Sequence, residues 1–127
     1  MDLPPIVTTD LGLAAWMAHL EPADLVGVDM EANGFHAYVE RVCLIQISTR
    51  QADCVIDPLA VRDLAPLGRW LANPSITKIM HGAEFDVTSF KRDFGFEVHG
   101  LFDTMHAARL LGLEKLGLSA LAAATLR

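Results

Sequence analysis

Three short apolar runs, at residues 25–31, 42–48 and 53–57, follow one another without a helical pattern between them. The middle run is almost wholly apolar, as in a strand that is covered on both faces. A short turn at residues 49–52 separates it from the third run. Strands joined by short loops favour an antiparallel meander. The first half of the chain therefore predicts a small antiparallel sheet.

After residue 57 the apolar pattern changes to alternating helices and strands. Apolar residues at helical spacing predict helices over 64–73, 83–94 and 103–112, with strands at 76–80 and 96–98. Three further elements are expected: a short strand or extended arm at 6–8, a helix at 10–20 capped by Asp10, and a helix at 120–127 capped by Ser119. Strands followed by helix–strand alternation predict an α/β sandwich with a mixed sheet. At 127 residues the chain forms one domain.

Composition limits the classes of protein to consider. The chain is 52% hydrophobic, but it has no apolar stretch long enough to span a membrane. Its N-terminus lacks the features of a secretion signal, so a cytoplasmic protein is expected, with two free thiols, Cys43 and Cys54. The net charge of −6 argues against a passive nucleic-acid coat. It argues less against an enzyme in which metal ions supply positive charge.

Acidic residues mark the end of the first strand. Asp29 and Glu31 follow the apolar run 25–28, and residues two apart in a strand point to the same face. Two carboxylates at the edge of a core would suit a pair of divalent cations, which can activate water and stabilise a leaving oxygen. The alternative is a strand end with two solvated acids. Asp86, in the first turn of the helix after strand 76–80, is the third candidate, and a helix-dipole role is its alternative.

Substrate contacts are expected from a loop and from one histidine. His81 lies at a strand-to-helix junction, where it could bind a nucleotide or satisfy local backbone. In the loop at 32–40, His36 could contact a base or phosphate, and Phe35 and Tyr38 could stack on bases, with ordinary loop packing as the alternative. Gln46 interrupts an apolar strand and needs a hydrogen-bond partner if it is buried.

These segments resemble, in order, the ribonuclease D-like branch of the DEDD 3'–5' exonucleases, on the ribonuclease H-like fold. The resemblance covers essentially the whole chain. It rests on Val28-Asp29-Met30-Glu31-Ala32-Asn33, Val42 to Ser48, Val55 to Leu59, Lys78 to Asp86, Arg92 to Phe96, Leu101 to Thr104 and Ala107 to Gly112.

The resemblance implies that Asp29, Glu31 and Asp86 are catalytic and bind two Mg²⁺ or Mn²⁺ ions. The substrate would be the 3' end of RNA or single-stranded DNA, from which water releases a nucleoside monophosphate. Substrate-binding candidates are Asn33, Phe35, His36 and His81. Met30 stands where the family usually has threonine, and its side chain is expected to face away from the acids.

The family's third motif, a Tyr or His followed four residues later by the fourth Asp, has no counterpart in these 127 residues. The domain at 1–127 is therefore expected to be incomplete at its C-terminus, to bind metal weakly and to hydrolyse little alone. Three readings stay open: a 3'–5' exonuclease domain, a catalytically silent fragment that binds nucleic acid or a partner protein, or a metal-binding structural domain without a substrate. The apolar face of the last helix would suit a homodimer, and no membrane association is expected.

Overall fold

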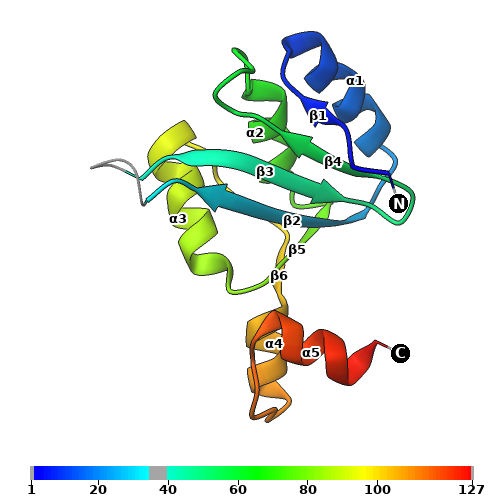
Figure 1. Cartoon of the computed structure of the whole chain (residues 1–127), viewed down its shortest axis with the longest axis vertical. Helices are drawn as coiled ribbons and strands as arrows, with labels where there is room; N and C mark the ends of the chain where they lie inside the picture. Colours follow the sequence, from blue (N-terminus) through cyan, green and yellow to red (C-terminus); the bar gives the residue numbers. More distant parts are fainter. Residues whose placement is uncertain (1, 35–39, 127) are drawn as a thin grey trace.

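The computed structural model describes residues 2–34 and 40–126. The elements are β1 (Ile6–Val7), α1 (Asp10–Leu20), β2 (Leu25–Ala32), β3 (Val42–Ser48), β4 (Asp53–Ile56), α2 (Ala65–Ala72), β5 (Thr77–Met80), α3 (Ala83–Phe94), β6 (Leu101–Asp103), α4 (Thr104–Leu110) and α5 (Leu118–Thr125). Figure 1 shows the sheet in the middle, with α1 and α2 above it, α3 crossing behind β2 and β3, and α4 and α5 below, beyond β6. None of the described helices is both long enough and apolar enough to cross a bilayer.

The described strands form one mixed sheet in the order β1-β4-β3-β2-β5-β6. β2, β3 and β4 form the predicted antiparallel meander, and β5 and β6 continue the sheet in parallel on the other side of β2. The short β1 adds a parallel strand at the β4 edge. The expected fold, three antiparallel strands followed by parallel strands and flanked by helices, is therefore confirmed.

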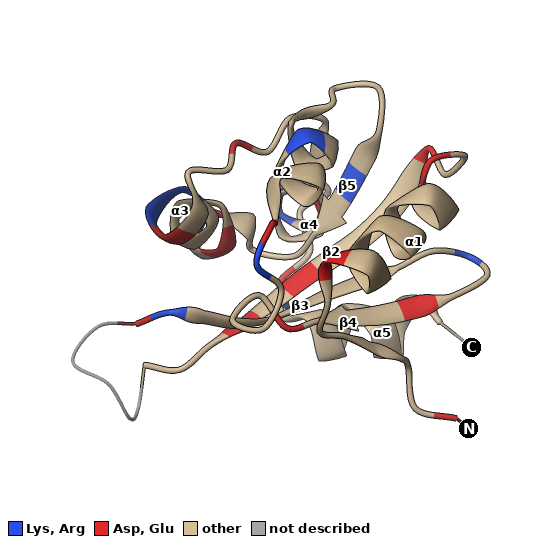
Figure 2. Ribbon diagram, turned by 90° about the horizontal axis from the view of Figure 1, so that it is seen from above, with Lys and Arg blue, Asp and Glu red and all other residues tan. Residues whose placement is uncertain are grey.

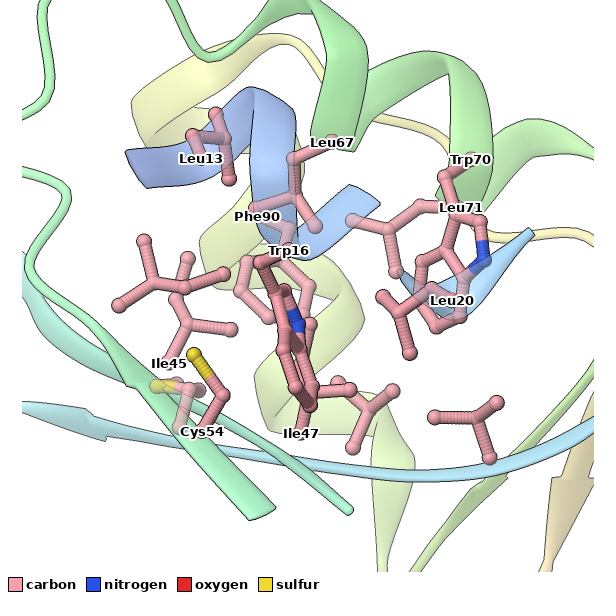
Figure 3. Packing of buried hydrophobic residues seen from close by; sticks show 14 of the residues in the cluster. Leu13, Trp16, Leu20, Ile45, Ile47, Cys54, Leu67, Trp70, Leu71 and Phe90 are labelled. Carbon is pink, nitrogen blue, oxygen red and sulfur yellow. The ribbon is translucent and has the colours of Figure 1, made fainter. Parts of the chain in front are cut away.

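One face of the sheet is covered by helices, and Figure 2 shows α1 and α2 lying over it. Alternation along β2 directs Val26, Val28 and Met30 into this layer, where all are buried. The helices supply large apolar side chains to the same core, and Figure 3 shows several of them packed together: Leu13, Trp16, Leu20, Leu67, Trp70, Leu71 and Phe90. Because the core lies on one side, the opposite face of β2 is free to carry polar groups.

A lysine is fully buried within this covered layer. Lys78, on β5, donates from Nζ to the backbone oxygens of Asn73 at 2.6 Å and His99 at 3.0 Å. Burial lowers the pKa of its ammonium group to about 8. The two hydrogen bonds tie the end of α2 to the segment that leads into β6, so Lys78 has a structural role.

Three local predictions were wrong. Residues 96–98 form no strand; Phe96 and Val98 instead pack against the core, and the pairing strand is β6. The N-cap of α1 is Thr9, whose hydroxyl accepts from Gly12 N. The last helix begins earlier than predicted, with Gly117 as its N-cap.

Other local predictions hold. α3 has the predicted bounds, and Gly95 ends it in the left-handed conformation. Asp103 is the N-cap of α4, at the start of the helix predicted over 103–112. Cys43 and Cys54 are free thiols, as expected, on the neighbouring strands β3 and β4.

Candidate active site

The first two candidate acids lie side by side on the open face of β2. Asp29 and Glu31 are exposed, whereas Met30 between them is buried, as the two-residue period of a strand requires. The Met30 N–H donates to Asp29 Oδ1 at 2.9 Å, which fixes the carboxylate orientation. The register with β3 shifts just after Glu31, so the strand has a local irregularity where the acids are.

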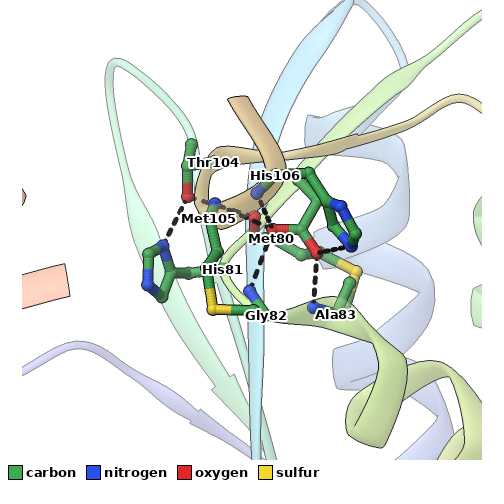
Figure 4. Close-up of polar contacts among 8 residues, drawn as sticks. Met80, His81, Gly82, Ala83, Thr104, Met105 and His106 are labelled. Atoms are coloured by element: carbon green, nitrogen blue, oxygen red, sulfur yellow. Dashed lines mark hydrogen bonds and ion pairs between the residues drawn. The ribbon is translucent and has the colours of Figure 1, made fainter. Parts of the chain in front are cut away.

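Asp86 reaches the same place from α3. This helix starts directly after β5, and Gly82 makes the turn between them with a φ of 61°. Gly82 has no side chain to cap the helix, and the Asp103 carboxylate does so from β6. It accepts from Gly82 N at 3.0 Å and from Ala83 N at 2.7 Å (Figure 4). The first turn of α3, and with it Asp86, is therefore held against the end of the sheet.

Asp103 is also the N-cap of α4, where it accepts from Met105 N and His106 N. Burial alone would raise the pKa of Asp103, but the hydrogen bonds from four backbone N–H groups outweigh it and lower the pKa. The carboxylate therefore stays ionised and joins the starts of two helices.

The Asp86 carboxyl is electrostatically strained. Burial, the charge of Asp29, a hydrogen bond with the Asp29 carboxyl and the charge of Glu31 together raise the pKa of Asp86 to about 7. The structure thus brings together Asp29 and Asp86, with Glu31 near enough to act on them.

The arrangement fits divalent cations in its donor chemistry, because carboxylate oxygens are the ligands that Mg²⁺ and Mn²⁺ prefer. In residues 2–34 and 40–126, no three His, Cys, Asp or Glu side chains surround one point closely enough to hold an ion. Asp29 and Asp86 lie close together, and the charge of Glu31 also acts on Asp86. A cation would offset the carboxylate repulsion that, with burial, raises the pKa of Asp86.

Two recesses open around the acids. A cleft of about 470 Å³ is lined by Asp29 of β2, Gln46 and Ser48 of β3, His81, and Thr104 and Leu118 of the C-terminal helices. A second recess, of about 310 Å³, contains Glu31, Asp86 and the exposed ring of Phe85. The three acids therefore line two recesses, Asp29 one and Glu31 and Asp86 the other.

Sequence reasoning did not place Gln46 or Thr104 in the larger cleft. Gln46 is the direct cross-strand neighbour of Asp29, so the polar interruption of β3 belongs to the site. Its isolation in an apolar strand was the available signal. Thr104 contacts His81, from 23 residues further along the chain, and nothing in its local sequence indicated this.

The substrate-binding candidates fall into two groups. His81 lines the cleft with Asp29. Asn33 lies at the base of the β2–β3 loop, where its Oδ1 accepts from Arg41 N and its N–H donates to Arg41 O. Phe35, His36 and Tyr38 lie outside the described residues. Substrate contact by any of these residues stays a prediction.

Comparisons with known proteins agree with this architecture. Residues 4–127 match a family model described as 3'-5' exonuclease. The exosome complex exonuclease RRP6 of Saccharomyces cerevisiae is 40% identical over 114 residues, which are 89% of this chain and 16% of that protein. The chain thus spans about a sixth of the length of this relative.

Solved structures extend the match to three dimensions. The catalytic core of RRP6 from Trypanosoma brucei superposes with a TM-score of 0.91 at 33% identity, over 97% of this chain and 34% of that one. Ribonuclease D of Escherichia coli superposes with a TM-score of 0.87 at 28% identity, over 98% of this chain and 34% of that one. NrnC of Brucella melitensis with bound Mg²⁺ superposes with a TM-score of 0.78 at 25% identity, over 99% of this chain and 62% of that one. The chain therefore belongs to the 3'-5' exonuclease family, as a ribonuclease D-like domain of the DEDD superfamily.

Proposed function

We propose that this domain removes nucleotides from the 3' end of RNA or single-stranded DNA, using divalent cations held by Asp29, Glu31 and Asp86. The observation that carries the proposal is the acid group itself. Two carboxyl groups close together, with the charge of a third acting on them, form an unfavourable arrangement in a protein without a compensating charge. Divalent cations would supply that charge.

The side chains have separate tasks in this proposal. Asp29 would be a ligand presented in a fixed orientation, because the Met30 N–H holds its Oδ1. Asp86 would be the ligand that must lose a proton before cations bind, since the pKa of its carboxyl is raised to about 7. When bound, the cations would activate water and stabilise the leaving oxygen of the phosphodiester.

The same cations would explain how an acidic chain binds a polyanion. The net charge is −6, and acidic residues interrupt β2 in Figure 2, at the site where a phosphate would have to bind. A phosphodiester would be repelled there unless cations lie between it and the carboxylates. Nucleic-acid binding at this site is therefore expected to depend on divalent cations.

Calorimetric titration with Mn²⁺ tests the cation site. The wild-type chain should bind Mn²⁺ weakly, and Asp29→Ala should remove the heat of binding. Glu84→Gln is the matched control, because Glu84 is an exposed acid in the same helical turn as Asp86. Equal heats for the wild type and Asp29→Ala would refute the site.

A second candidate is a binding module without hydrolysis. Exposed leucines on and beside α4 and α5 favour it, because neighbouring apolar side chains in water are typical of a contact surface: Leu110, Leu111, Leu113 and Leu118. Oligonucleotides labelled at the 5' end separate the two functions. Mn²⁺-dependent loss of single nucleotides from the 3' end, absent in Asp29→Ala, supports the exonuclease. Binding without shortening supports the module.

A further inference from the structure

His81 and Thr104 form a polar contact at the wall of the larger cleft. His81 Nδ1 lies 2.8 Å from Thr104 Oγ1, and that hydroxyl lies 3.2 Å from the backbone oxygen of Met80 (Figure 4). The three groups come from the end of β5, the turn after it and the start of α4. They therefore connect two segments that are more than twenty residues apart in the chain.

Only one arrangement of protons makes both contacts hydrogen bonds. A threonine hydroxyl has one proton, and a backbone carbonyl can only accept. Thr104 must therefore donate to Met80 O, which leaves its oxygen to accept from His81. In a neutral imidazole this places the proton on Nδ1 and a free lone pair on Nε2.

The hydroxyl is held in place from both sides. Thr104 is the first residue of α4, directly after Asp103, whose carboxylate is fixed by four backbone N–H groups. The parallel pairing of Met80 with Asp103 brings the Met80 carbonyl next to this helix start. Thr104 Oγ1 is thus a rigid partner for the imidazole.

The second ring nitrogen is the functional end of this arrangement. In Figure 4, Nε2 of His81 lies on the side of the ring away from Thr104, and His81 lines the same cleft as Asp29. No described residue is recorded as a hydrogen-bond partner of Nε2. A neutral Nε2 accepts hydrogen bonds, so it suits a hydroxyl group and does not suit an unprotonated phosphate oxygen.

We propose that Thr104 is a positioning residue that holds His81 in its Nδ1–H form, so that Nε2 accepts a hydrogen bond from a sugar hydroxyl of the 3'-terminal nucleotide. The choice of ligand rests on the proposed function, under which the sugar next to the cleaved phosphodiester would lie in the cleft that Asp29 and His81 line. The tautomer itself does not depend on it. The 2'- and 3'-hydroxyls share this chemistry, and the experiment separates them.

Long-range ¹H–¹⁵N NMR of the imidazole reads the tautomer without nucleotide, metal or catalysis. Spectra are recorded at rising pH up to about 9, so that a neutral ring is observed. The wild type should show Nδ1 as the protonated nitrogen. Thr104→Val removes the acceptor and should lower the ratio of Nδ1–H to Nε2–H about five-fold, the effect of one ordinary hydrogen bond. Thr104→Ser should restore it.

The backbone amide spectrum of each variant shows whether the fold is kept. If Thr104→Val does not fold, the wild type and Thr104→Ser still decide the tautomer. A wild-type ring protonated on Nε2, or an unchanged ratio in folded Thr104→Val, would overturn the positioning role. Neither result depends on exonuclease activity.

Nucleoside monophosphates then test the ligand. With Mg²⁺ present, since phosphate binding beside the acids is expected to need a cation, AMP should shift the His81 Nε2 resonance, and the 2',3'-dideoxy analogue should not. Whichever of 2'-deoxy AMP and 3'-deoxy AMP loses the shift identifies the hydroxyl that is bound. An equal shift with the dideoxy analogue, or no shift with AMP at millimolar concentration, would overturn the assignment of a sugar hydroxyl.

Discussion

Replacing Asp86 by Asn should stabilise the cation-free protein at pH 8 while removing a proposed cation ligand. The pKa of Asp86 is raised from 3.8 to about 7. The full shift means that ionising Asp86 costs about 4 kcal/mol more in the folded than in the unfolded state, because each pKa unit is worth about 1.4 kcal/mol. Asp86 is only half-buried, and solvent screening and local relaxation reduce the effect. We expect a gain of about 1–2 kcal/mol.

The sign follows from proton linkage. The folded state holds the Asp86 proton more tightly than the unfolded state, so protonation stabilises the fold below about pH 4. That contribution is lost as the pH rises through about 7. The amide of Asn is never charged, so the advantage of Asp86→Asn should be largest at pH 8 and less than half as large at pH 5.

Urea unfolding in EDTA measures the difference. With a slope of about 1–3 kcal/mol per molar urea, the midpoint of Asp86→Asn should rise by roughly 0.5–1 M at pH 8. Glu84→Gln removes a charge from the same helical turn, but its side chain is exposed, so its stability should change by less than about 0.5 kcal/mol. If Asp86→Asn is no more stable than the wild type at pH 8, or gains equally at pH 5, burial and carboxylate repulsion do not destabilise the ionised Asp86 carboxyl.

Adding Mn²⁺ should narrow or reverse the difference in stability between Asp86→Asn and the wild type. A ligand that binds only the folded state adds about 1.4 kcal/mol at ten times its Kd. The wild type should gain this amount, and Asp86→Asn, which lacks one of the proposed ligands, should gain little. An equal gain in both would show that Mn²⁺ binds elsewhere.

Three further outcomes follow from the site and its supports. Mn²⁺ affinity should weaken as the pH falls through about 7, because Asp86 must release its proton, and calorimetry in buffers of different ionisation heat would detect that release. Asp103→Ala should destabilise the fold by about 2–4 kcal/mol in urea unfolding, since backbone N–H groups of two helices lose their acceptor. The destabilisation caused by Asp103→Ala should be smaller in acid. The pKa of Asp103 is lowered in the folded state, so the stability that its carboxylate contributes to the wild type is lost as the pH falls. Gly100→Ala should cost more than Gly95→Ala in the same assay, because both have positive φ but only at Gly100 would a Cβ meet backbone, 2.4 Å from Ile76 O.

The fold could be predicted from sequence largely because burial follows local periodicity. The meander and α3 gave clear patterns, and the structure has them within a few residues. The strand expected at 96–98 was wrong for a physical reason: alternating Phe96 and Val98 indicated burial, and they are half-buried without pairing. β6 gave no such pattern, because both Leu101 and Phe102 on this edge strand are exposed.

The site was predictable only in part. Asp29 and Glu31 are two residues apart in one strand, so their common face follows from strand geometry. The approach of Asp86, and the place of Gln46 opposite Asp29, depend on how separate elements are arranged and on strand register. Local sequence does not contain that information, and the resemblance to a family supplied it for Asp86 alone.

The supports of the site converge on two consecutive residues. Asp103 holds the start of α3, which carries Asp86, and Thr104 holds the imidazole of His81. Both depend on the register of β6 with β5, and a shift of one residue in a strand turns every side chain to the opposite face. A one-residue insertion before Leu101 would therefore disturb the acid group and the histidine together. The core would change little, because the side chains of Leu101 and Phe102 are exposed. In this domain the geometry of the active site is more sensitive to its edge strand than the fold is.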